Sequence, residues 1–150
     1  MPQPKAASAT GMAGDKGRGA ADIRQDFPGG WAGDTNNAFS ESGRTEEQNK
    51  FFDFTSKLFQ WRKGKSVIHS GKMTHYIPEN NVYVYFRYND KETVMVVINN
   101  AAETKTFKTN RFQENIKNFK SGKDVLTGKA VDLKNEISLD GKSVLILELN

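Results

Sequence analysis

The residues with the clearest chemical potential lie between positions 24 and 31, where the sequence is RQDFPGGW. Arg24 and Asp26 are close enough in the chain to form an ion pair or to bind the hydroxyl groups of a ligand. Pro28 and the two glycines after it favour a turn just before Trp31. The pattern fits either a loop that binds hydroxyl groups or a turn with a purely structural role.

A second candidate is the pair Tyr83 and Tyr85, which alternate with apolar residues along an expected strand. Two aromatic rings on one face of a strand could stack on the rings of a sugar. Aromatic residues in this pattern also pack in cores or across strands. Both interpretations remain open for this pair.

Other motifs predict no metal and no cofactor. His69 and His75 are the two imidazoles, and neither has a close acidic partner or a second ligand at metal-binding spacing. Residues 14–19, GDKGRG, resemble a phosphate-binding loop only in composition, because the Gly-Lys-Ser/Thr ending is missing. The absence of cysteine excludes disulfides, thiolate nucleophiles and thiolate metal sites.

Length and composition favour a single domain with an appendage, since 150 residues with 36% hydrophobic content can form one modest core. The net charge of +4 comes from lysines scattered among acids and amides, so we expect no nucleic-acid partner. No apolar run approaches the roughly 20 residues that span a bilayer. The first ten residues lack the apolar core of a secretory signal, and the compartment stays undetermined.

The centre of the expected fold is residues 81–99. Two apolar runs, 82–88 and 93–98, flank a polar loop, which is the pattern of an antiparallel hairpin. Both faces of the first run are apolar or aromatic, and the second run is apolar without a break. Such strands need a covering layer, which the rest of the chain is expected to supply.

Before the hairpin, the sequence predicts an arm and a helix. Residues 1–44 hold eight of the 13 glycines and indicate a loop. Thr45 and Gln48 have capping-box spacing, and Lys63 followed by glycine favours a helix end. The helix carries a wide apolar stripe that needs cover, so an isolated chain is expected to self-associate or rearrange. The stripe consists of Phe51, Phe52, Phe54, Thr55, Leu58, Phe59 and Trp61.

From residue 65 onward the hydrophobic pattern becomes alternating. Besides the hairpin, strands are expected at 66–70, 73–78, 104–108, 124–126, 130–133, 136–139 and 143–149, and a short helix at 110–119 with a turn at 121–123. Short strands closely separated by turns predict a mostly-β fold. We expect an antiparallel sandwich of about eight strands over residues 65–150.

The order of these motifs resembles the end of the catalytic barrel and the following domain C of the α-amylase family of glycoside hydrolases, most of all its neopullulanase and cyclomaltodextrinase branch. The resemblance covers residues 11–150. It is carried by GMAGD at 11–15, IRQDFPGGW at 23–31, FQWRKG at 59–64, the hairpin ending in Asn99 and Asn100, DVLTGK at 124–129 and the run 144–149.

The resemblance implies three parts. Residues 1–44 would be the loop at the end of the barrel, residues 45–64 the last barrel helix, and residues 65–150 a C-terminal β-sandwich with Greek-key-like connections. It also implies that Arg24, Asp26 and Trp31 contact substrate in the parent enzyme.

The catalytic carboxylates of that family cannot be assigned in this chain. A retaining glycosidase needs a nucleophile and an acid about 5 Å apart on a rigid frame. The tripeptide from Arg24 to Asp26 imitates the family's Arg-x-Asp but lacks the preceding apolar strand, and no His-Asp dipeptide occurs. We therefore expect the active centre to lie upstream of residue 1.

Two roles follow as expectations. The first is a non-catalytic domain that shields an upstream barrel and holds its last helix, while the parent hydrolyses α-glucans. The second is a module that binds starch or maltooligosaccharides through Tyr83 and Tyr85.

Overall fold

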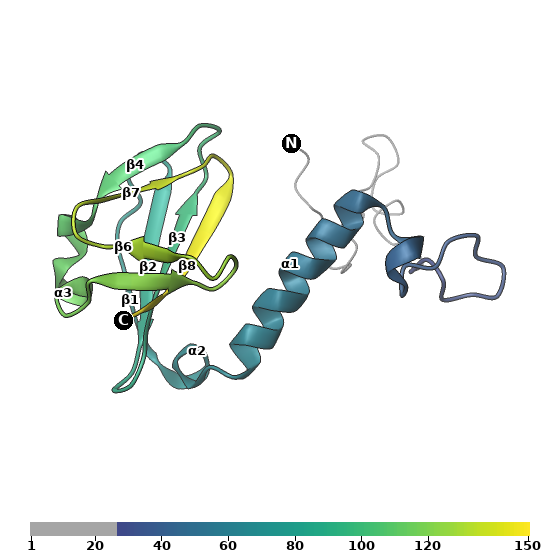
Figure 1. The fold of residues 1–150 in the computed structure, drawn as a ribbon, viewed down its shortest axis with the longest axis horizontal. Helices are drawn as coiled ribbons and strands as arrows, with labels where there is room; N and C mark the ends of the chain where they lie inside the picture. Colours follow the sequence, from purple (N-terminus) through teal and green to yellow (C-terminus); the bar gives the residue numbers. More distant parts are fainter. Residues whose placement is uncertain (1–26) are drawn as a thin grey trace. The chain divides into compact units, whose positions relative to one another are not determined.

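The computed structural model describes residues 27–150, which form two compact units, one ending at Phe59 and the other running from Gln60 to Asn150 (Figure 1). The expectations for residues 14–19, Arg24 and Asp26 lie outside the described residues. None of the helices between residues 27 and 150 is long and apolar enough to cross a membrane.

Helix α1 (Glu46–Lys63) begins where the sequence predicts it. The backbone N–H of Thr45 donates to Gln48 Oε1 at 2.9 Å, and the Gln48 N–H donates to Thr45 Oγ1 at 3.2 Å. This reciprocal pair is the predicted capping box. No residue of α1 is buried, so its phenylalanine stripe lies partly open.

Six strands form the main sheet of the second unit, in the order β1-β2-β3-β8-β5-β6, and all neighbours are antiparallel. Their bounds are β1 (Lys72–His75), β2 (Val82–Tyr88), β3 (Thr93–Asn99), β5 (Ser121–Asp124), β6 (Ala130–Asp132) and β8 (Ser143–Leu149). The hairpin of β2 and β3 confirms the predicted centre of the fold. Its register pairs Val82 with Asn99 and Tyr88 with Thr93.

A second sheet of two strands, β4 (Lys105–Lys108) and β7 (Glu136–Leu139), packs against the main sheet (Figure 1). The 3-10 turn η3 (Thr109–Phe112) and helix α3 (Gln113–Ile116) complete this layer. The core between the layers consists of Val82, Val84, Phe86, Met95, Val97, Phe112, Ile116, Leu133, Ile137, Leu147 and Leu149. Eight strands between residues 27 and 150 thus form the predicted mostly-β sandwich.

The strand predicted at residues 66–70 is wrong, because this segment is the short helix α2 (Ser66–Ser70). Two carbonyl oxygens of α2 accept hydrogen bonds from a side chain outside the helix. The Arg87 side chain donates to the carbonyl oxygens of Val67 at 3.4 Å and Ile68 at 2.9 Å. Val67 is fully buried, so tertiary packing and capping override the β propensity of Val67 and Ile68.

Residues 110–126 also differ from the prediction. The expected single helix is divided into η3 and α3, although Phe112 and Ile116 are buried on one face as predicted. The expected turn at 121–123 belongs to β5, and the expected strand at 124–126 is mostly a turn. Position 122 of β5 is occupied by glycine, because β8 leaves no room for a side chain: an added Cβ would lie 2.9 Å from Leu147 Cβ.

Candidate functional site

Trp31 lies in a turn at the predicted position. The Gly30 N–H donates to the Phe27 carbonyl at 3.0 Å, and Gly29 has a φ of +94°. The Asp34 carboxylate fixes this turn by accepting bonds from Gly29 N at 2.7 Å and Trp31 N at 3.1 Å. The Trp31 side chain is 66% exposed. Sequence reasoning missed Asp34, although an aspartate three residues after the turn is a recognisable signal for such a bond.

We define the outer face as the side chains of the main sheet that point away from β4 and β7. The strand register sets them in three rows: Met73, Arg87, Val94, Glu148, Lys123 and Ala130; His75, Tyr85, Val96 and Ile146; and Tyr83, Ile98 and Val144. Most of these residues are apolar or aromatic.

The outer face is only partly covered within the second unit. Val94, Val96 and Ile146 are buried, whereas Met73 and Ile98 are 49% and 38% exposed. Met73 lies on the edge strand β1, and Ile98 lies next to the last residue of β3. The unbroken apolar sequence of β3 therefore reflects a core on one side and an incompletely covered face on the other.

Tyr83 and Tyr85 lie on this face and lean on each other. Their ring centroids are 5.6 Å apart with an interplanar angle of 34°, and His75 meets the edge of Tyr83 at 6.3 Å. Both tyrosines are half-buried, and burial raises the pKa of the Tyr85 hydroxyl above its usual value. The pair thus supplies apolar and aromatic area to the outer face.

A polar cluster joins the end of α1 to one edge of the outer face. Trp61 Nε1 donates to Glu148 Oε1 at 2.6 Å, and Lys65 Nζ lies 2.7 Å from the same oxygen and 3.0 Å from Glu92 Oε1. We call these four residues the Trp61 clamp. Sequence reasoning did not find it, because its members are distant in the chain.

The charges of the Trp61 clamp reinforce one another. Burial alone would raise the pKa of Glu148, but the hydrogen bonds from Lys65 and Trp61 outweigh it and lower that pKa. The hydrogen bonds to Glu148 and Glu92 raise the pKa of Lys65. The clamp is therefore held together by charge-assisted bonds, which are stronger than neutral ones.

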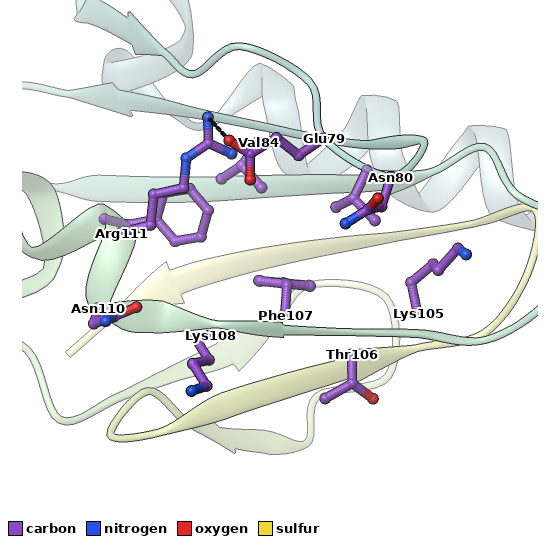
Figure 2. A pocket seen from close by; sticks show the side chains of 11 residues that line it. Glu79, Asn80, Val84, Lys105, Thr106, Phe107, Lys108, Asn110 and Arg111 are labelled. Carbon is purple, nitrogen blue, oxygen red and sulfur yellow. Dashed lines mark ion pairs between the residues drawn. The ribbon is translucent and has the colours of Figure 1, made fainter.

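A pocket of about 390 Å³ opens on the other side of the main sheet (Figure 2). It lies between the start of β2, strand β4 and η3. Glu79 and Arg111 form an ion pair of 3.0 Å on one side, and Lys105 and Phe107 point toward the pocket from β4.

Residues 73–148 match the family model described as the cyclomaltodextrinase C-terminal domain. The chain belongs to this family. The match spans β1 to β8, so the fold unit that carries the outer face and the pocket is the cyclomaltodextrinase C-terminal domain itself.

Solved structures of α-amylase-family enzymes share this domain's fold. An Anoxybacillus α-amylase is 20% identical with a TM-score of 0.58, covering 71% of this chain and 26% of its own. The Geobacillus thermoleovorans α-amylase, solved with acarbose, is 18% identical with a TM-score of 0.60, covering 74% and 24%. AmyP, solved with maltose, is 20% identical with a TM-score of 0.62, covering 70% and 21%. The chain thus spans roughly a quarter or less of the length of these enzymes.

The sequence-predicted residues that the structure describes are divided between the two units. Tyr83 and Tyr85 contact each other on its outer face, while Trp31 belongs to the unit that ends at Phe59. His69 Nε2 lies 3.0 Å from the Arg62 carbonyl oxygen. Within residues 27–150, no three His, Asp or Glu side chains gather closely enough to hold a metal ion.

Acid is expected to open the Trp61 clamp. Because the folded-state pKa of Glu148 is lowered below the value of about 4.3 for an unfolded glutamate, its contribution to stability is present above that pH. This contribution is lost as the pH falls through the folded-state pKa. Fluorescence of Trp61 in a Trp31→Phe background, where it is the sole tryptophan of the chain, should report the opening.

Two variants make this pH test specific. Glu148→Gln should remove the acid-induced change in Trp61 fluorescence. Glu136→Gln, which alters an exposed carboxyl on β7, should leave it unchanged. An identical acid transition in Glu148→Gln and the unaltered chain would contradict the assignment of the clamp.

Proposed function

We propose that this domain is a non-catalytic support for the catalytic barrel of an α-glucan-hydrolysing enzyme. The observation that carries the proposal is the outer face, where Met73 on the edge strand β1 and Tyr83 and Ile98 near the ends of β2 and β3 leave apolar area partly uncovered. Burying such area against a neighbouring domain would stabilise both by about 25 cal/mol for each Å² removed from water.

The Trp61 clamp would provide a second attachment between the domain and the barrel. Residues 45–64, which include α1, are proposed to be the last barrel helix. Trp61 and Lys65 then tie the end of that helix to Glu148 of β8. The domain would hold the barrel both through its outer face and through the chain that enters it.

The test places a charge on the outer face. In the full-length enzyme that carries the domain, Ile98→Asp should lower the melting temperature by several degrees, because an unpaired carboxylate would be buried against the barrel. In the isolated 150-residue chain, where Ile98 is exposed to water, the same change should cost only about 0.5 kcal/mol. Differential scanning calorimetry of both proteins makes the comparison.

Ile77→Asp is the matched control. Ile77 is 77% exposed and lies outside the strands that form the outer face. Ile77→Asp should leave the melting temperature of the full-length enzyme unchanged. Equal effects of Ile98→Asp in the enzyme and in the isolated chain would refute docking through this face.

The non-catalytic role has its own test. The purified 150-residue chain should release no reducing sugar from maltodextrin. Activity that persists through purification and disappears on Asp26→Asn would show that the arm contains a working nucleophile.

The second candidate function is sugar binding by Tyr83 and Tyr85. Their partly exposed rings on the outer face favour it. This use competes with barrel docking for the same surface, so the two proposals exclude each other at that face.

A further inference from the structure

The pocket beside β4 has rigid walls. One wall is the turn before β2, where Glu79 and Val82 exchange two backbone hydrogen bonds of 3.0 and 2.8 Å. Asn80 and Asn81 have φ values of 52° and 64°, as a tight two-residue hairpin turn requires. The other wall is β4, which is paired along its length with β7. A site with preformed walls loses little entropy when a ligand binds.

The floor of the pocket is apolar and its rim is polar. Val82, Val84 and Phe112 are buried beneath it, and Phe107 is half-buried. Around the rim lie Glu79, Arg111, Lys105, Asn80 and Asn110. An apolar surface with a few convergent polar groups is the usual composition of a small-molecule site, and 390 Å³ falls within the usual range of about 300–1,000 Å³.

Three of the four charged side chains that line the pocket are already paired, and the fourth, Lys108, is exposed to solvent. Arg111 pairs with Glu79 at 3.0 Å and donates to the Ile77 carbonyl at 2.8 Å, and Lys105 pairs with Glu103 at 2.7 Å. An ionised ligand would have to compete with these partners. The side-chain amides of Asn80 and Asn110, in contrast, have no hydrogen-bond partner among residues 27–150. Each amide can donate and accept, which suits a neutral ligand rich in hydroxyl groups.

We propose that this pocket binds the end of an α-glucan chain. A glucose ring has apolar C–H faces and a periphery of hydroxyl groups, which correspond to the Phe107 floor and the amide rim. The choice of an α-glucan over other saccharides rests on the proposed function of the parent enzyme. The pocket lies on the opposite side of the main sheet from Tyr83 and Tyr85, so glucan binding and barrel docking can occur together.

The test is a titration of the 150-residue chain with maltotriose, followed by amide chemical shifts. Shifts should centre on Asn80, Phe107 and Arg111. Asn80→Gly should weaken binding by about fivefold or more, since it removes one hydrogen-bonding amide while glycine keeps the positive φ of the turn.

Asn81→Gly is the matched control, because Asn81 shares the turn and its positive φ but does not line the pocket. It should bind maltotriose like the unaltered chain. Retained dispersion of the amide spectrum shows that both variants fold.

Shifts centred on Tyr83 and Tyr85 would overturn the proposal that the pocket binds glucan and would support the second candidate function. The absence of saturable shifts, or equal weakening by Asn80→Gly and Asn81→Gly, would also overturn it. Docking of the barrel is measured separately by Ile98→Asp in the full-length enzyme, which does not alter the pocket. Each proposal can therefore fail without the other.

Discussion

Replacing Phe86 with alanine is expected to lower the free energy of unfolding of the domain by about 3–5 kcal/mol. Phe86 is fully buried at the centre of the core. Its ring meets Tyr76 edge-on at 5.9 Å and lies 6.2 Å from the ring of Phe112. Truncation would lose both the burial and these ring contacts, and the rigid sheet would leave a cavity behind. Urea denaturation followed by circular dichroism measures the change.

Two further variants keep the Phe86 test informative. Phe86→Leu keeps most of the apolar volume and should cost much less, so it provides a folded intermediate if the alanine variant does not fold. Ile77→Ala removes a similarly apolar side chain that is 77% exposed, and should stay within about 0.5 kcal/mol. If Phe86→Ala and Ile77→Ala cost the same, the core does not lie between the two sheets.

Replacing Asn99 with alanine is expected to cost about 2–4 kcal/mol. Asn99 is 1% exposed at the end of β3. Its Nδ2 donates to the carbonyl oxygens of Glu103, Leu139 and Asp140 at 3.0, 2.9 and 3.0 Å, and its Oδ1 accepts from Ala101 N at 2.9 Å. Alanine would remove all four bonds in a site closed to water, although the Asp140 carbonyl oxygen would keep its bond from the Ser143 hydroxyl.

Asn99→Asp is a more specific test, because it replaces the Nδ2 amide donor with a carboxyl oxygen that faces three carbonyl oxygens. Burial and repulsion raise the folded-state pKa of the introduced carboxyl above its unfolded value of about 3.9. The variant should therefore be most stable below pH about 4 and lose stability as the pH rises through the folded-state pKa. Asn100→Ala, at an exposed neighbouring position, is the control and should show little effect. A flat pH profile for Asn99→Asp would contradict the bonding described.

The parts of the fold that sequence predicted are those set by local patterns. Alternation and turn residues located β2, β3, β7 and β8, and the spacing of Thr45 and Gln48 located the start of α1. The family was also evident in the sequence, because its motifs occur in order. The predicted ends of a strand agreed well with the structure where residues on both faces of the strand had a clear apolar pattern.

The errors arose where a distant side chain decided the local structure. The Arg87 side chain bonds two carbonyl oxygens of the helical segment 66–70, and the closeness of β8 requires glycine at position 122 of β5. Neither effect can be read from the segment itself. Both α2 and β5 depend on contacts with residues that are distant in the sequence.

The candidate sites depended even more on tertiary contacts. Tyr83 and Tyr85 were identified from their alternation, but the Trp61 clamp joins residues 87 positions apart, and the pocket combines a turn, a strand of the second sheet and η3. Composition suggests candidate residues, but only the fold shows which of them meet.

Strand β8, although late in the chain, lies in the middle of the main sheet between β3 and β5. During synthesis, β1 to β3 leave the ribosome with one long apolar edge unpaired, and that edge cannot close until residues 143–149 have followed. Nascent chains interrupted before this point would present an open template for other strands. The domain is thus expected to need chaperone protection during translation, and premature stop codons in its last few residues should produce aggregation rather than a shortened but soluble protein.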